Sequence, residues 1–267
     1  MTDAGQQGAL SREFIRISRL RKIFGPGTAS ELIALKDITC SIREGNFVSI
    51  VGPSGCGKST LLRILAGLLD YSEGSVTMDD QPVRGTRRDV GVVFQNSILL
   101  PWRTVLDNVM LPAEVLGLDI KAARHRAREL LAMVRLEGFE NRLPGELSGG
   151  MQQRASIARA LLHDPRILLM DEPFGALDAM TREQMNMELQ RIWAESRKTI
   201  VLITHSIPEA VFLGDVVFVM TARPGTLERV IPVDLPRPRN MTTMSAAAFG
   251  AKTQEIRALF NHAGAFD

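Results

Sequence analysis

The chain has 267 residues, of which 45% are hydrophobic and 23% charged, so it carries enough apolar material for a sizeable core and is not mainly disordered. Its formal net charge of +2 is too balanced to indicate a nucleic-acid binder. No apolar run approaches the roughly 18 to 20 residues that cross a bilayer, and the N-terminus lacks a secretory signal pattern. With two cysteines, Cys40 and Cys56, a disulfide scaffold is excluded. We therefore expect a soluble, cytoplasmic, globular protein.

Apolar patterns predict the strands in chain order. Residues 1–12 are small and polar, and we expect them to be disordered. Between residues 13 and 42 apolar positions alternate, which predicts half-buried antiparallel strands on either side of a loop at 24–31. Continuous apolar runs predict strands buried on both faces, as in a parallel sheet, at 47–52, 90–94, 166–172, 199–204 and 216–220.

Helical patterns separate several of these runs, as expected of an α/β protein. We predict helices at 59–69 and 181–197, the second with a capping box of Thr181 and Gln184. From about 101 to 145 we predict inserted helices. They include a basic helix at 119–136, with an inner side made of Ile120, Ala123, Leu130, Leu131 and Val134. The last thirty residues, after the proline-rich run 235–240, read as a partly ordered tail ending in a short helix.

The run GPSGCGKS at 52–59 matches G-x-x-x-x-G-K-[ST], between a buried strand and a helix. An ordinary glycine turn is the alternative, but the full match in this context predicts a phosphate-binding P-loop. Glycines let the backbone amides point at phosphate oxygens, Lys58 can reach the β- and γ-phosphates, and the Ser59 hydroxyl can coordinate Mg²⁺. The predicted nucleotide-binding residues here are Gly52, Pro53, Ser54, Gly55, Cys56, Gly57, Lys58, Ser59 and Thr60.

Two further runs add chemistry. ILLMDE at 167–172 ends a buried strand with two carboxylates: Asp171 is predicted to hold Mg²⁺ and Glu172 to polarise an attacking water. LSGGMQQR at 147–154 places Ser148, Gly149 and Gly150 at the start of a helix, which is a second anion-binding terminus.

This combination resembles the ATP-binding cassette (ABC) ATPases, whose signature motif begins LSGG, over residues 13 to about 240. The resemblance implies a P-loop NTPase fold with a mainly parallel core sheet, an antiparallel β subdomain, and a helical subdomain inserted at about 97–160 in a RecA-like core. Residues 241–267 would form a C-terminal extension. It further implies a head-to-tail homodimer that sandwiches ATP and Mg²⁺ between the P-loop of one subunit and the signature of the other.

The resemblance also assigns roles to single residues. Gln95 stands at the Q-loop position, which implies contact with Mg²⁺ and the attacking water. Asp178 stands in the D-loop at the dimer contact, and His205 at the switch position that bonds the γ-phosphate. Phe24 takes roughly the place of the aromatic that stacks on adenine. Met151 replaces the glutamine often found fifth in the signature, so that contact is either absent or moved to Gln152.

ABC cassettes that occur as lone short chains usually energise a separate membrane permease. This implies a peripheral protein on the cytoplasmic face of the inner membrane, served indirectly by a periplasmic solute-binding protein and without a nucleic-acid partner. The segment 97–109 resembles the part of importer cassettes that grips the permease, with Leu99, Leu100 and Trp102 as the apolar groove; core packing is the alternative for each. The run 220–239, with ARPG and LPRPR, is similar to nitrate, sulfonate, taurine and bicarbonate importer ATPases, which implies a small oxyanion as solute.

Two other classes share parts of this pattern. The cassette of an exporter or lipoprotein-release complex has the same chemistry, and the ARPG run disfavours it by analogy. Soluble ABC ATPases that act on DNA insert a long coiled coil between P-loop and signature, whereas only about ninety residues intervene here, without sustained heptads. Those that act on the ribosome carry two cassettes, and this chain has one of each motif.

Overall fold

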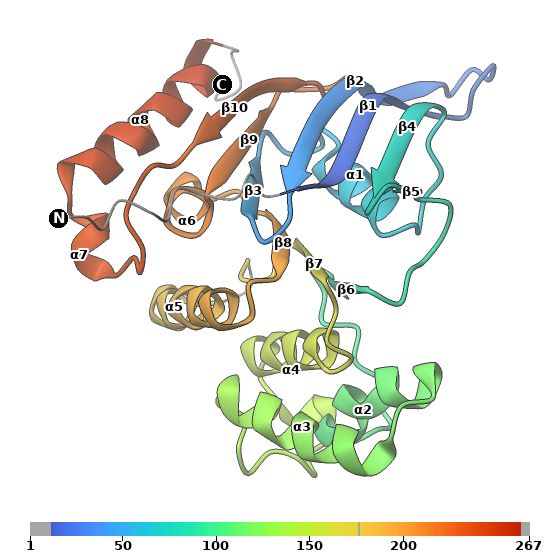
Figure 1. Cartoon of the computed structure of the whole chain (residues 1–267), viewed down its shortest axis with the longest axis vertical. Helices are drawn as coiled ribbons and strands as arrows, with labels where there is room; N and C mark the ends of the chain where they lie inside the picture. Colours follow the sequence, from blue (N-terminus) through green and yellow to red (C-terminus); the bar gives the residue numbers. More distant parts are fainter. Residues whose placement is uncertain (1–11, 176, 263–267) are drawn as a thin grey trace, which may run out of the picture.

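The chain builds two β-sheets and a separate group of helices, which Figure 1 shows at the lower end of the molecule. The computed structural model describes residues 12–175 and 177–262. The disorder predicted for residues 1–12 therefore concerns a segment that lies, except for Arg12, outside the described residues.

The first sheet is antiparallel, in the order β2-β1-β4-β5. Its strands are β1 (Glu13–Phe24), β2 (Leu32–Arg43), β4 (Glu73–Met78) and β5 (Gln81–Pro82). Ile15 and Ile17 of β1 are buried and lie opposite Ile42 and Cys40 of β2, which confirms the antiparallel pair predicted from the alternation. The sequence pattern does not predict β4 and β5, because few of their side chains are buried.

The second sheet has the order β10-β9-β3-β8-β7-β6, and all its pairs are parallel except β10 with β9. Its strands are β3 (Phe47–Val51), β6 (Val90–Val93), β7 (Ile167–Asp171), β8 (Thr199–Ile203), β9 (Val216–Met220) and β10 (Leu227–Pro232). Every residue of β3, β7 and β8 is buried, which explains their continuous apolar runs. The predicted parallel core sheet is thus confirmed. The sequence pattern does not predict β10, because its residues are mostly exposed.

Helices cover both faces of the core sheet. Helix α1 (Lys58–Leu65) lies between the two sheets, where its leucines share one apolar cluster with both. On the other face lie α5 (Ala179–Ser196) and α6 (Ile207–Leu213). The predicted capping box at the start of α5 is wrong: the helix begins earlier because Asp178 caps it, its Oδ1 accepting the Thr181 N–H at 3.0 Å.

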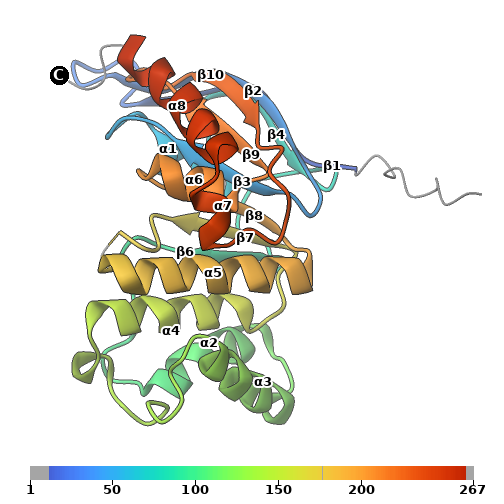
Figure 2. The ribbon, with the colours of Figure 1, turned by 90° about the vertical axis from the view of Figure 1, so that its left-hand side faces the viewer.

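The remaining helices between β6 and β7 pack mainly on one another, away from the antiparallel sheet (Figure 2). They are α2 (Val105–Leu116), α3 (Ile120–Met133) and α4 (Gly149–Leu161), with a short 3₁₀ turn at Pro144–Glu146. The inner side predicted for the basic helix is right except at Ile120, which is 46% exposed. Ile120 is the first residue of α3, and the fully buried Ala127 takes the inner face instead.

The C-terminal segment is more structured than the partly ordered tail predicted from the sequence. After α7 (Met241–Met244), helix α8 (Ala247–His262) runs for 16 residues and packs against α6. Phe249, Ile256 and Phe260 are buried and lie on the side of α8 that faces the core, which the prediction of a short helix missed.

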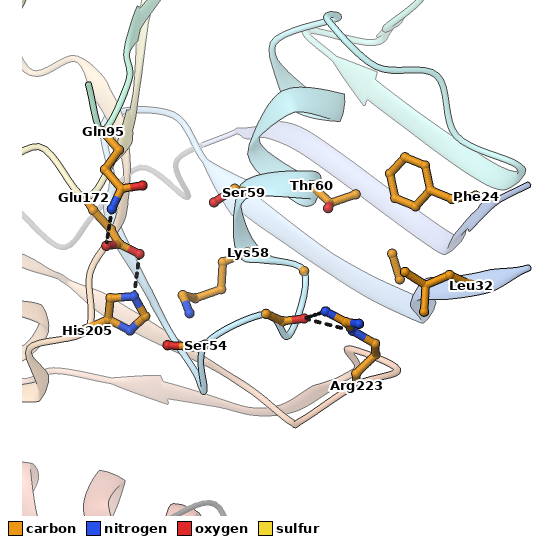
Figure 3. Close-up of a pocket in the computed structure, with 13 residues that line it drawn as sticks. Phe24, Leu32, Ser54, Lys58, Ser59, Thr60, Gln95, Glu172, His205 and Arg223 are labelled. Atoms are coloured by element: carbon orange, nitrogen blue, oxygen red, sulfur yellow. Dashed lines mark hydrogen bonds and ion pairs between the residues drawn. The ribbon is translucent and has the colours of Figure 1, made fainter. Parts of the chain in front are cut away.

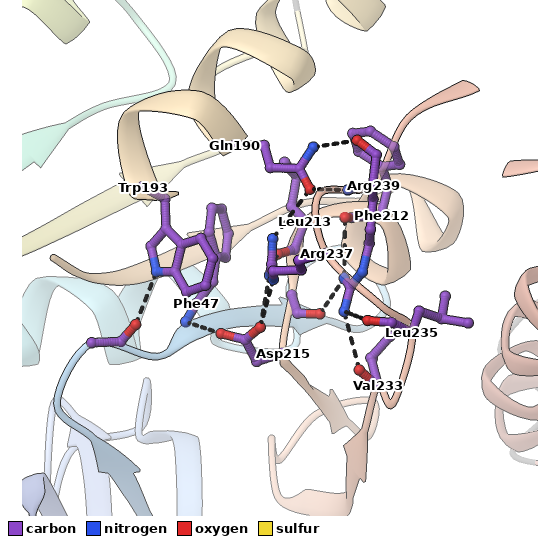
Figure 4. Close-up of polar contacts among 12 residues, drawn as sticks. Phe47, Gln190, Trp193, Phe212, Leu213, Asp215, Val233, Leu235, Arg237 and Arg239 are labelled. Carbon is purple, nitrogen blue, oxygen red and sulfur yellow. Dashed lines mark hydrogen bonds and ion pairs between the residues drawn. The ribbon is translucent and has the colours of Figure 1, made fainter. Parts of the chain in front are cut away.

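A buried arginine attaches this C-terminal segment to the core (Figure 4). The side chain of Arg239 is 1% exposed, and burial lowers its pKa to about 10, so it is still charged at neutral pH. The Gln190 amide of α5 bonds both the N–H and the C=O of Arg239. The guanidinium donates to five backbone carbonyls at 2.7–3.3 Å, three at the end of α6 and two just after β10; they are those of Val211, Phe212, Gly214, Val233 and Leu235. The charge is therefore compensated by peptide dipoles.

Replacing this guanidinium should destabilise the fold. We expect Arg239→Met to lower the free energy of unfolding by about 3 kcal/mol, since the apolar side chain leaves buried carbonyls without donors. Urea unfolding followed by circular dichroism measures the change. Arg257→Met on the exposed side of α8 is the matched control and should stay within about 0.5 kcal/mol of the parent. Equal stability of the two variants would contradict this role.

Candidate functional site

The carboxyl ends of three core strands meet at one edge of the sheet. Parallel pairing sets Ile50 of β3 level with Ile203 of β8, and Ile203 level with Asp171 of β7. The chain after each strand therefore emerges at the same place. These continuations carry the P-loop at 52–59, Glu172, and His205, which are distant in the sequence.

The P-loop connects β3 to α1 through a backbone that only glycine fits. Gly55 has φ +73° and Gly57 has φ +103°, both in the left-handed region. A Cβ on Gly57 would lie 2.7 Å from Leu35 Cδ2 and 2.9 Å from the Ala34 carbonyl oxygen. Gly57 is also the N-cap of α1 and no side chain caps this end, so the first amides of the helix are available to an anion.

Lys58 is folded back onto the loop. Its side chain is buried, and Nζ donates to the carbonyl oxygens of Gly52 at 2.8 Å and Pro53 at 2.9 Å. Cys56 beside it is buried, and burial raises the pKa of its thiol, which fits the absence of a predicted redox role. The ammonium group is thus kept at the loop by neutral acceptors, from which a phosphate can take it.

Ser59 and Asp171 form a pair suited to a magnesium ion. The Ser59 hydroxyl donates to Asp171 Oδ1 at 3.0 Å, and Asp171 is only 5% exposed. Within the described residues no group of three or more His, Cys, Asp or Glu side chains could hold a metal unaided. One carboxylate and one hydroxyl are nevertheless the set that Mg²⁺ takes when phosphate oxygens and waters complete its coordination. The residues present fit that ion.

Glu172 lies between two other predicted site residues. Its Oε2 accepts a bond from Gln95 Nε2 at 3.3 Å, and its Oε1 lies 2.5 Å from His205 Nε2. The Glu172 backbone has φ +47°, which is unfavourable for a residue with a side chain. Its N–H is held by the Ile203 carbonyl at 3.0 Å, so the neighbouring strand β8 fixes this geometry.

These groups line one cavity of about 380 Å³ (Figure 3). Phe24, Leu32 and Ala34 form an apolar end, with Phe24 38% exposed. The P-loop, Gln95, Glu172 and His205 form the polar part. An apolar end with an exposed ring, joined to a phosphate-binding loop, matches a nucleotide in shape and chemistry. The structure thus brings Phe24, Gln95, Glu172 and His205 together with six P-loop residues: Ser54, Gly55, Gly57, Lys58, Ser59 and Thr60. Gly52, Pro53, Cys56 and Asp171 do not line this cavity, and Asp171 adjoins it through its bond from Ser59.

Arg223 also lines this cavity, and it is absent from the predicted site. It belongs to the ARPG run, which drew attention in the sequence only as a mark of resemblance to one group of importers. Arg223 contacts Gly55 of the P-loop, and no local pattern predicts this contact because the two residues are 168 positions apart.

The signature residues and Asp178 do not reach the cavity of their own chain. Ser148 caps α4, its hydroxyl accepting the Met151 N–H at 3.3 Å, and Gly149 and Gly150 follow in the first turn. Gln152, considered as a replacement for the missing signature contact, is occupied within its own subunit. Its amide donates to the Pro144 and Leu147 carbonyls and accepts from Ser97.

Known proteins are similar to this chain over most of its length. A family model described as ABC transporter matches residues 35–175. An uncharacterized ABC transporter ATP-binding protein of Methanocaldococcus jannaschii is 46% identical over 242 residues, covering 91% of this chain and 90% of its own. The aliphatic sulfonates import ATP-binding protein of Bacillus licheniformis is 46% identical over 222 residues, covering 83% and 86%.

Solved structures agree with these matches. A dimeric ATP-binding cassette in a post-hydrolysis state, bound to ADP and Pi, superposes with a TM-score of 0.75 at 38% identity, covering 82% of this chain and 98% of its own. A cassette from Clostridium perfringens that is part of an ABC transporter complex superposes with the same TM-score at 26% identity, covering 93% and 95%. Family match, relatives and fold agree with the P-loop geometry, and the chain belongs to the ABC transporter family as one of its ATP-binding ATPase subunits.

Proposed function

We propose that this protein is the ATP-hydrolysing subunit of an importer that takes up a small oxyanion, such as nitrate, a sulfonate or taurine, through a separate permease. The observation that carries the ATPase part is the cavity lined by Lys58, Ser59 and Glu172, with Asp171 bonded to Ser59 beside it. The import part is supported by relatives named as aliphatic sulfonate import proteins. The exporter and soluble alternatives have no comparable support.

We assign the site residues as follows. The adenine ring lies against Phe24, and the phosphates rest on the amides of residues 52–60 with Lys58 at their β and γ groups. Mg²⁺, when bound, neutralises the phosphate charge that develops during cleavage; Ser59, Gln95 and Asp171 hold it. Glu172 takes a proton from the attacking water, and His205 leaves Glu172 to bond the γ-phosphate. The contact of Glu172 with both Gln95 and His205 supports this exchange of partners.

The second half of the site belongs to a second copy. Ser148, Gly149 and Gly150 start α4 outside the lining of the cavity of their own chain, and Asp178 caps α5 outside it as well. In a head-to-tail homodimer the signature of each copy closes the nucleotide of the other, with Asp178 at the contact. The dimeric cassettes among the similar solved structures support this arrangement.

The permease contact lies just after Gln95. Trp102 is 74% exposed and Ile98 is 56% exposed, whereas Leu99 and Leu100 are half-buried, with Leu99 packed on the core. Asn108 of α2 fixes this loop by accepting the Leu100 N–H at 2.7 Å and donating to the Leu100 carbonyl at 3.1 Å. A rigid loop that presents a large exposed aromatic is a suitable anchor for a partner helix.

Membrane attachment is then peripheral, on the cytoplasmic face, with a periplasmic solute-binding protein acting through the permease and no nucleic acid involved. None of the helices in the described ranges is long and apolar enough to cross a bilayer. We take residues 13–240 as the ATPase unit, with the helical segment at about 97–160 as its insertion and 241–267 as its extension.

Removing the proposed base should separate binding from hydrolysis. We expect Glu172→Gln to bind ATP but to hydrolyse it roughly 100-fold more slowly or worse, because the amide cannot accept the water proton. The variant should then elute as a dimer in size-exclusion chromatography with ATP. Phosphate release measures turnover, and Glu228→Gln on exposed β10 is the control. Normal turnover of Glu172→Gln would refute the assignment.

The exposed tryptophan tests the permease contact. We expect Trp102→Ala to weaken binding to the detergent-purified partner permease by roughly tenfold or more, while ATP affinity of the free subunit is kept. Val230→Ala, an exposed apolar side chain of β10, is the control and should bind as the parent does. Equal retention of both variants on the immobilised permease would place the contact elsewhere.

The solute class has its own test. The complete complex, reconstituted in vesicles with its solute-binding protein, should import radiolabelled taurine, an alkanesulfonate or nitrate when ATP is supplied, and should fail to do so with Glu172→Gln. A lipid or peptide exported instead would contradict the importer proposal.

A further inference from the structure

We propose that the turn between β9 and β10 is a clasp that holds the P-loop in its binding shape, with Arg223 as a positioning residue for the nucleotide. The clasp is defined as residues 221–226. This inference rests on the proposed nucleotide site and extends it by a residue that the motifs do not contain.

The first contact of the clasp is with the apex of the P-loop. Arg223 Nε and Nη2 donate to the Gly55 carbonyl oxygen at 3.2 Å and 3.0 Å, a two-pronged contact that Figure 3 shows at the rim of the cavity. Gly55 is one of the two positive-φ glycines that curl the loop. Fixing its carbonyl outward fixes the orientation of the adjoining peptide, and so the direction of the amides that face a phosphate.

The second contact is a close approach of Gly225. A Cβ on Gly225 would lie 1.9 Å from the Cys56 carbonyl oxygen, so the turn is pressed directly against the loop backbone. Gly225 also bonds both ways with β2: its N–H donates to Ala34 O at 3.0 Å, and its carbonyl accepts the Lys36 N–H at 2.9 Å. Ala34 belongs to the apolar end of the cavity, so the clasp joins the adenine wall to the phosphate loop.

The clasp is itself rigid. The Thr221 N–H donates to Thr226 O at 3.1 Å, the Thr226 N–H donates to Thr221 Oγ1 at 3.0 Å, and the two hydroxyls are 2.9 Å apart. It begins directly after β9, which pairs in parallel with β3, the strand that leads into the P-loop. The turn and the loop it holds are therefore anchored on adjacent strands.

The consequence concerns binding more than hydrolysis. A loop already shaped for phosphate loses less conformational freedom when the nucleotide arrives, and that saving appears in affinity. Arg223 contacts the loop rather than Glu172 or the Ser59–Asp171 pair. Its loss should therefore raise the ATP Kd and KM, while kcat at saturating ATP falls by much less.

The test compares three variants of the full chain by displacement of a fluorescent ATP analogue and by steady-state hydrolysis. We expect Arg223→Met to raise the ATP Kd about fivefold, because a charge-assisted contact is lost at an exposed site. Arg223→Lys, which keeps the charge and one donor but not the fork, should recover part of the affinity. Arg229→Met, which removes an exposed guanidinium from the same hairpin, should bind as the parent does.

Inorganic triphosphate gives a second readout. It should lose affinity for Arg223→Met by the same factor as ATP does, since the clasp shapes the phosphate loop. Gly225→Ala tests the same contact in another way, because its Cβ would clash with the Cys56 carbonyl oxygen and displace the turn. It should weaken ATP binding without removing any charge. It keeps the inference testable if Arg223→Met unfolds at lower urea than Arg229→Met.

Three outcomes would overturn the clasp: parent-like ATP affinity of Arg223→Met, parent-like affinity of Gly225→Ala, or a fall in kcat with unchanged KM. Failure of the nucleotide site itself is recognised separately. In that case Lys58→Ala, which should lose roughly tenfold to hundredfold in ATP affinity, would bind ATP as the parent does.

Discussion

The parallel pairing of β3, β8 and β7 is the constraint from which the rest of the site follows. It sets Ile50, Ile203 and Asp171 level, so that three loops from distant parts of the chain leave one edge of the sheet together. Strands buried on both faces make that edge stiff, since every residue of the three strands packs against a neighbour. Loops carried on such strands start from fixed positions, and this keeps their functional groups close together.

The helical group is tied to this edge through the segment after β6. Gln153 of α4 donates to the Phe94 carbonyl at 2.9 Å, immediately before Gln95, and Arg159 donates to the carbonyls of Ser97 and Ile98. Gln95 thus has Glu172 on one side and the signature helix on the other. These hydrogen bonds connect Glu172 to α4 and to the loop that presents Trp102, and we propose that a change of partner at Glu172 reaches both through them.

How far the sequence leads depends on the range of the contacts involved. The P-loop, the Asp171–Glu172 pair and the buried strands are local patterns, and the structure has them where the sequence predicts them. Elements held by distant partners were not predicted correctly. Strand β10 is mostly exposed and owes its place to pairing with β9, and helix α8 owes its length and position to packing on α6. Arg223 was missed for the same reason. The Thr181 cap was assigned wrongly because Asp178, three residues earlier, already caps the helix by accepting the Thr181 N–H. Ser148 and Asp178 form no part of the cavity in one chain, as expected if a second copy completes it in the proposed dimer.

The groups assigned to the nucleotide already have protein partners. Lys58 is held by the Gly52 and Pro53 carbonyls, Ser59 by Asp171, and His205 by Glu172. Each of these bonds must be exchanged when phosphate enters. The free energy gained on binding is therefore only the difference between a bond to a protein acceptor and a bond to a charged phosphate oxygen. In the proposed mechanism, releasing His205 frees Glu172 at the same moment, so the base is exposed only when there is a phosphate for the histidine to bond. The Arg223–Gly55 contact is different, because it engages a carbonyl oxygen of the loop and leaves the amides free for phosphate, so it need not break. The site therefore combines bonds that are exchanged during turnover with one that persists, and the persistent bond keeps the loop in shape while the others change partners.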